Sequence, residues 1–127
     1  MAANPEVGLK LIGPVGLPAP LQGFADRVWR LDSLPYGEYL RELADSDLTI
    51  APLADDGFNI FKSQVKVLEA GLLGVPLVAS RTLYDRYVED GVSGVLCAPQ
   101  QWPEALIRVV EDAAFRKQLG AAGQESV

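Results

Sequence analysis

The sequence predicts an α/β fold, a doubly wound parallel sheet with helices on both faces. Short apolar segments alternate along the chain with segments of helical periodicity, which is typical of parallel strands joined by crossover helices. The chain has 127 residues, of which 49% are hydrophobic and 22% charged, values typical of one ordinary globular domain. A chain of this length buries about two-thirds of its unfolded surface, which is enough for a core without disulfides.

Five segments have the apolar character of strands, and each is followed by a loop or a helix. In chain order, they are Val7–Gly13, Arg27–Leu31, Asp47–Leu53, Leu77–Ser80 and Gly94–Cys97. The fourth is a short apolar run of the kind that a sheet covered on both faces buries. If the five belong to one doubly wound sheet, ligands should gather where the strands end.

Helices are expected between and after these strands. They cover Tyr36–Ala44, Ile60–Leu73, Leu83–Val88 and Trp102–Asp112, with a short fraying helix in the tail, 113–127. The second is the strongest, because it carries an apolar stripe typical of a helix that packs tightly against a core. This stripe consists of Phe61, Val65, Leu68 and Leu72. Gly74 and Pro76 follow it as a helix stop.

What the chain lacks excludes several functions. It contains no histidine, so Ser-His-Asp and Cys-His catalysis and most zinc sites are excluded. Its net charge of −6 argues against binding to nucleic acid or anionic lipid. No apolar run is long enough to cross a bilayer and no signal segment opens the chain, so we expect a soluble cytoplasmic protein. The single cysteine, Cys97, lies in an apolar stretch and is expected to be a buried strand thiol.

Lys62, Lys66 and Glu69 form a second stripe on the strongest helix, at i, i+4 and i+7. The two lysines repel each other, and Lys62 lies in the first turn, where the helix dipole favours anions. An anion bound at this helix N-terminus would remove both penalties, and Ser63 and Asn59 would add hydrogen bonds or cap the helix. The alternative is a solvated face on which Lys66 pairs with Glu69. Against that alternative, Glu69 lies among apolar neighbours, where its carboxylate suits the vicinal hydroxyls of a sugar.

Two other groups of polar residues are weaker candidates. Asp55 and Asp56 form an acid or metal pair or, as we prefer, a turn before Gly57. Arg81 and Arg86 follow a strand end, where they reach a ligand or form ordinary salt bridges at the surface. No P-loop, dinucleotide-binding glycine motif or nucleophile elbow is present, and no metal site is assigned.

The stretch SDLTIAPL…FNIFKSQVKVLEAGLLGVPLVAS…YVEDGVSGVL, residues 46–96, resembles the C-terminal domain of GT-B glycosyltransferases of the group 1, retaining type. The shared pattern is a strand ending in proline, a glycine-containing loop and a helix ending in Leu-Glu-Ala. Gly-x-Pro-x-Val-Ala-Ser and a later Asp-Gly-x-x-Gly follow, and the helix reads Asn-x-x-Lys-Ser-x-x-Lys-x-x-Glu. Both ends of the chain fit the same Rossmann-like domain, so the resemblance covers nearly all of it.

The resemblance implies a nucleotide-sugar donor site. Glu69 matches the second glutamate of the family's Glu-x7-Glu element, which holds the nucleotide ribose. The first glutamate falls at Phe61, so the chain departs from the family at the carboxylate that contacts the donor sugar. The resemblance also implies contacts to the diphosphate and the sugar, from Gly57, Asn59, Lys62, Ser63 and Lys66. The implied contact to the base is the backbone of Leu34. The resemblance implies no metal and assigns no catalytic residue.

The resemblance also implies that residues 1–127 are a single partial domain. The expected missing parts are the N-terminal acceptor domain and the first strand-helix unit of the donor domain, which usually supplies a basic residue to the phosphates. That first strand is central in a doubly wound sheet, so its neighbours would close up or recruit a partner chain, such as a second copy in a homodimer. We therefore expect a fragment that is inactive alone.

The parent protein is expected to move a sugar from a nucleotide-diphosphate sugar to an acceptor, without a cofactor and with peripheral membrane contact allowed. The alternative is a non-catalytic α/β interaction or regulatory module, including a degenerate transferase scaffold. A receiver-like domain is disfavoured, because it needs a lysine after the strand Leu77–Ser80, where Arg81 stands.

Overall fold

The computed structural model describes residues 7–12, 26–31, 33–51 and 63–126. They belong to two compact units, Met1–Arg41 and Glu42–Val127. Parallel strands flanked by helices confirm the predicted α/β class, and all five expected strands are present. The pairing differs from the single sheet expected, because the described strands hydrogen-bond only within their own unit, as a two-stranded and a three-stranded sheet.

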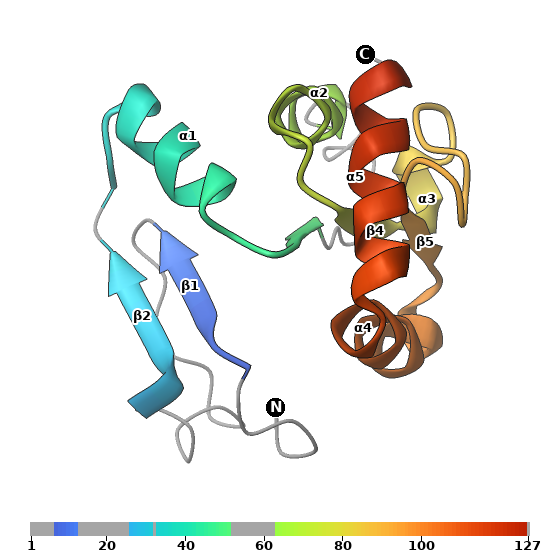
Figure 1. Cartoon of the computed structure of the whole chain (residues 1–127), viewed down its shortest axis with the longest axis horizontal. Coiled ribbons are helices and arrows are strands. Elements are labelled where there is room, and N and C mark those ends of the chain that lie inside the picture. The colour runs from blue at the N-terminus through green and yellow to red at the C-terminus, as the bar shows by residue number, and fades with distance from the viewer. Residues whose placement is uncertain (1–6, 13–25, 32, 52–62, 127) are drawn as a thin grey trace. The chain divides into compact units, whose positions relative to one another are not determined.

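The first unit contains the two-stranded sheet. In it, β1 (Leu9–Ile12) and β2 (Val28–Leu31) run side by side in the same direction (Figure 1). The Arg27 Nη1 atom donates a hydrogen bond to the carbonyl oxygen of Val7 at 3.2 Å, which ties together the segments that enter the two strands. After β2 comes α1 (Tyr36–Ala44), whose bounds are those predicted.

The second unit is built on the three-stranded parallel sheet. Its strands β3 (Thr49–Ala51), β4 (Leu77–Ser80) and β5 (Val95–Cys97) lie in the order β3-β4-β5. The central strand is β4, and its Val78 and Ala79 side chains are both 0% exposed. This agrees with the predicted strand that is buried on both faces.

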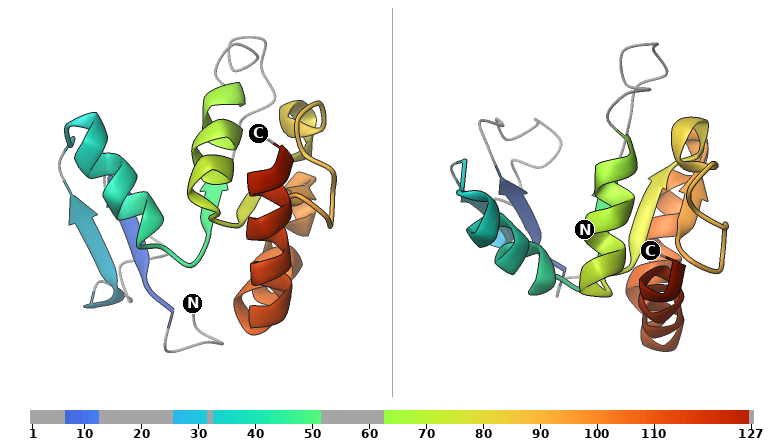
Figure 2. Two further views of the ribbon diagram at one scale, coloured as in Figure 1. Left: turned by 45° about the horizontal axis from the view of Figure 1, so that its top comes forward. Right: turned by 90° about the horizontal axis from the view of Figure 1, so that it is seen from above.

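Helices cover both faces of this sheet. They are α2 (Ser63–Leu73), α3 (Arg81–Tyr84), the 3₁₀ helix η3 (Pro99–Gln101), α4 (Trp102–Glu111) and α5 (Ala113–Ser126). Both views of Figure 2 show α2 and α5 close together, and these two helices are in contact. None of the described helices combines the length and apolar character that crossing a membrane requires.

The core has one layer on each face of the three-stranded sheet. The layer that includes α2 and α3 consists of Ala51, Ala70, Leu77, Ala79, Tyr84, Val88 and Leu96. The layer that includes α4 and α5 consists of Val78, Val95, Cys97, Val109, Phe115 and Leu119. Alternate residues of β4 and β5 supply the two layers, as the two-residue period of a strand requires.

Two helices differ in length from the prediction. The expected helix over Leu83–Val88 is only the short α3, which ends at Tyr84 and continues as a turn. The last helix is a full 14-residue helix rather than a short fraying one. The reason is tertiary packing, because Phe115 and Leu119 are buried and anchor it to the sheet.

The apolar stripe predicted on α2 does not face the core. Val65, Leu68 and Leu72 are 55%, 41% and 68% exposed, whereas Glu69 and Ala70 are 5% and 2% exposed. Ala70 lies on the opposite side of the helix from the stripe and enters the core, and the half-buried Val67 packs against the same layer. The larger residues Val65, Leu68 and Leu72 therefore lie on the side of α2 away from this layer.

The predicted stop of α2 is confirmed in detail. Gly74 has φ = 68°, the left-handed conformation that glycine adopts at little cost. The N–H of Gly74 donates to the Gly71 carbonyl oxygen at 3.1 Å, and the N–H of Val75 donates to that of Ala70 at 2.9 Å. These two bonds form a Schellman motif, which satisfies the last carbonyl groups of the helix.

Candidate functional site

The carboxyl ends of the three parallel strands share one edge of the sheet in the second unit. The residues at this edge are Ala51, Ser80 and Cys97, which end β3, β4 and β5. Because α2 joins the end of β3 to the start of β4, its N-terminus at Ser63 opens at the same edge. Ligands of doubly wound sheets bind at this kind of edge, where helix N-termini offer free N–H groups.

Of the residues predicted to bind a donor, the structure places Lys66 and Glu69 together on α2. Lys66 is exposed in the second turn, and Glu69 lies three residues further along the same helix and is 5% exposed. Ser63 is the first residue of α2. Leu34 is half-buried in the first unit, just before α1. The remaining three, Gly57, Asn59 and Lys62, lie outside the described residues, as do Asp55, Asp56 and Phe61.

Glu69 is the only carboxylate among the buried residues of the described part of the chain. Burying a carboxylate is unfavourable unless it is paired or hydrogen-bonded. The described residues contain no buried side-chain nitrogen or oxygen atom that lacks a hydrogen-bond partner. Glu69 is therefore part of a satisfied polar arrangement within an otherwise apolar helix face, and its carboxylate is held in a restricted orientation.

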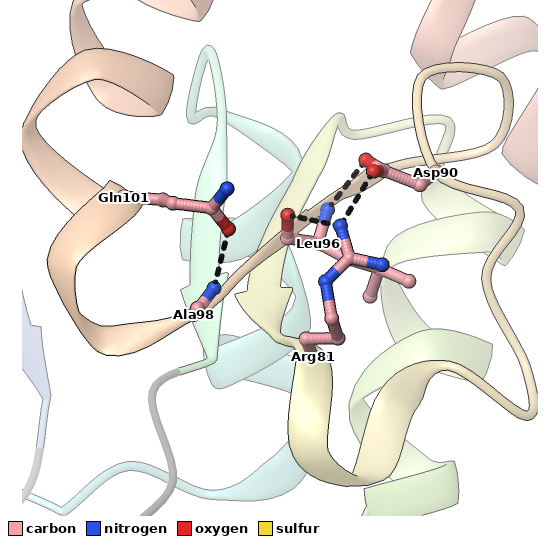
Figure 3. A network of polar contacts seen from close by, with 5 residues as sticks. All are labelled: Arg81, Asp90, Leu96, Ala98 and Gln101. Atoms are coloured by element: carbon pink, nitrogen blue, oxygen red, sulfur yellow. Dashed lines mark hydrogen bonds and ion pairs between the residues drawn. The ribbon is translucent and has the colours of Figure 1, made fainter.

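Arg81 and Asp90 form a polar network beside β5 (Figure 3). The Arg81 Nη2 atom lies 2.8 Å from Asp90 Oδ2, and it also donates to the Leu96 carbonyl oxygen at 3.4 Å. The other carboxylate oxygen, Asp90 Oδ1, accepts the Leu96 N–H at 2.9 Å. Of the two interpretations of Arg81 from sequence, a ligand contact or a salt bridge, the structure shows the salt bridge.

This network closes the outer edge of β5, the edge away from β4. In a parallel strand, the N–H and C=O of one residue point to the same side, and successive residues alternate. Both backbone groups of Leu96 bond to the Arg81–Asp90 pair, so the pair occupies the place of a further strand. Blocking an edge in this way prevents unwanted strand pairing.

The network also sets the ionisation of nearby groups. Burial by itself raises the pKa of Asp90, but the Leu96 N–H and the Arg81 guanidinium outweigh it, so the pKa lies below its ordinary value. Burial raises the pKa of the Cys97 thiol, and the charge of Asp90 raises it further. Cys97 is 1% exposed, so the prediction of a buried strand thiol is confirmed.

We expect Asp90→Ala to lower the free energy of unfolding by about 1–2 kcal/mol at pH 7, because it leaves the buried Leu96 N–H without an acceptor. Chemical denaturation measures this loss. Glu89→Ala is the matched control, because Glu89 is an exposed carboxylate in the same loop whose backbone N–H, rather than its side chain, bonds to Ser93. An equal loss in both variants would contradict the role assigned to Asp90.

The Asp90 contribution should also depend on pH. Its folded-state pKa is lowered, so the stabilisation is present above the ordinary pKa of 3.8 and is lost as pH falls through the folded value. The difference in stability between the wild type and Asp90→Ala should therefore shrink as the pH is lowered below that value. A difference that stays constant down to pH 2 would contradict the lowered pKa.

The carboxyl end of β5 is ordered by a local cap. The backbone N–H of Ala98 donates to the side-chain Oε1 of Gln101 at 2.8 Å (Figure 3). This bond fixes the turn through η3 that leads from β5 into α4. In the part of the chain that the structure describes, no three His, Cys, Asp or Glu side chains come together as a metal site.

Comparison with known proteins identifies relatives for this arrangement. Residues 2–114 match the family described as glycosyl transferases group 1. The chain is 29% identical over 138 residues to D-inositol 3-phosphate glycosyltransferase of Corynebacterium diphtheriae, covering 96% of this chain and 31% of that protein. It is 35% identical over 92 residues to the protein of the same name from Nocardioides sp., covering 69% of this chain and 19% of that protein. The chain thus spans less than a third of these relatives.

Solved structures agree on the fold. Anabaena HepE has been solved in complex with UDP-glucose and with UDP, and the chain matches these structures with TM-scores of 0.68 and 0.66. The sequence identity is 22%, over 96% of this chain and 36% of HepE. At this level of identity, the similarity shows a shared fold.

Proposed function

Because the chain belongs to the group 1 glycosyl transferases, we propose that it binds the nucleotide-sugar donor of an enzyme that transfers the sugar to an acceptor. The observation that carries the proposal is Glu69, a carboxylate only 5% exposed on the helix that begins where the parallel strands end. The solved HepE complex with UDP-glucose makes UDP the first nucleotide to test.

In this proposal, Glu69 accepts hydrogen bonds from the two ribose hydroxyls of the nucleotide. A carboxylate suits this role because its two oxygens accept a pair of neighbouring hydroxyl groups. The buried position of Glu69 fixes the carboxylate in advance, so little side-chain entropy is lost when the ribose binds.

The diphosphate is assigned to the N-terminus of α2. The free N–H groups and the helix dipole favour an anion at this end, and Lys66 adds a positive charge one turn further along. Ser63 begins the helix, and Gly57, Asn59 and Lys62 precede it in the sequence as the remaining donor contacts. As the glycosidic bond to the diphosphate breaks, negative charge grows on the leaving group, and these fixed donors stabilise it.

The proposal for the whole protein follows from the length of the relatives. This chain is assigned to one partial donor-binding domain, and the acceptor is assigned to a separate N-terminal domain of a longer protein, located in the cytoplasm. The reaction takes place between the two domains, so this chain alone is expected to bind a donor without transferring its sugar. No catalytic residue and no metal ion are assigned.

Titration of the ¹⁵N-labelled chain with UDP, GDP, dTDP and ADP tests donor binding through amide chemical shifts. We expect saturable shifts in the first turns of α2, and a Kd for the preferred nucleotide that rises about 10–100-fold in Glu69→Gln. Lys66→Ala should weaken the binding of nucleoside diphosphates more than the binding of the nucleoside, because only the diphosphates carry phosphate groups. Glu111→Gln, at an exposed position on α4, is the control and should leave the Kd unchanged.

Two results would contradict the proposal. Saturable shifts that stay unchanged in Glu69→Gln would contradict the proposed contact between Glu69 and the ribose. Shifts confined to other elements would place the ligand elsewhere. An absence of shifts with all four nucleotides would overturn donor binding by this chain and leave the non-catalytic interaction module as the better interpretation.

A further inference from the structure

We draw no further inference here: the strongest candidate, the exposed apolar stripe of Val65, Leu68 and Leu72 on α2, carries none, because nothing in the described part of the structure shows what covers it.

Discussion

Leu119→Ala should lower the free energy of unfolding by about 2–5 kcal/mol, whereas Leu72→Ala should change it by less than about 1 kcal/mol. Both changes remove the same atoms from a leucine in a helix. Leu119 of α5 is 1% exposed and packs with Val109 and Phe115, so its truncation leaves a cavity. Leu72 of α2 is 68% exposed, so its truncation removes little buried surface.

Urea denaturation followed by circular dichroism measures both variants against the wild type. The comparison decides whether the apolar stripe of α2 is exposed in solution, because a stripe that packs against a core would make the two losses similar. If Leu72→Ala costs as much as Leu119→Ala, the exposed position of Leu72 is wrong. If Leu119→Ala costs less than about 1 kcal/mol, the assignment of α5 to the core is wrong.

Much of the fold could be predicted because local signals and tertiary structure agree there. The run Leu77–Ser80 is apolar at nearly every position, and a strand buried on both faces needs that composition. Gly74 and Pro76 ended α2 as predicted, since the left-handed turn favours glycine and proline cannot continue a helix. The tail, in contrast, has few local helix signals, and its helix depends on the burial of Phe115 and Leu119.

The orientation of α2 could not be predicted from periodicity. The stripe of Val65, Leu68 and Leu72 has the spacing of a core-facing helix, but periodicity shows only that a helix has an apolar side. The side that packs is the one that carries Ala70 and the half-buried Val67, and the spacing of the larger apolar residues does not indicate it. The exposed stripe is therefore the place where the pattern in the sequence and the packing disagree.

The candidate site, too, has one part that could be predicted from the sequence and one that could not. Lys66 stands out in the sequence because it and Lys62 are like charges one turn apart, and Glu69 because it lies among apolar neighbours. The structure places Lys66 and Glu69 on α2 and buries Glu69. The Arg81–Asp90 pair could not be predicted as a unit, because Asp90 looks like an ordinary turn former before glycine. Its partner is nine residues away, and its second contact, Leu96, depends on which side of β5 faces outward.

Gly120→Ala should lower the free energy of unfolding by about 3 kcal/mol, although alanine is intrinsically the better helix former. Gly120 lies inside α5, where α5 crosses the C-terminal turn of α2. A Cβ atom at this position would lie 2.3 Å from the carbonyl oxygen of Gly74 and 3.2 Å from its carbonyl carbon. Both are backbone atoms, so no flexible side chain can move aside and the two helices must separate.

Gly37→Ala is the control with the opposite sign. Gly37 lies in α1, and an added Cβ atom there would have no atom within 4 Å. Alanine should therefore stabilise the chain by about 0.5–1 kcal/mol through the lower entropy of its unfolded state. A loss in Gly120→Ala alone assigns the effect to the contact between α2 and α5. Stabilisation in both variants would show that the two helices do not meet at Gly120, because only the intrinsic preference for alanine would then remain.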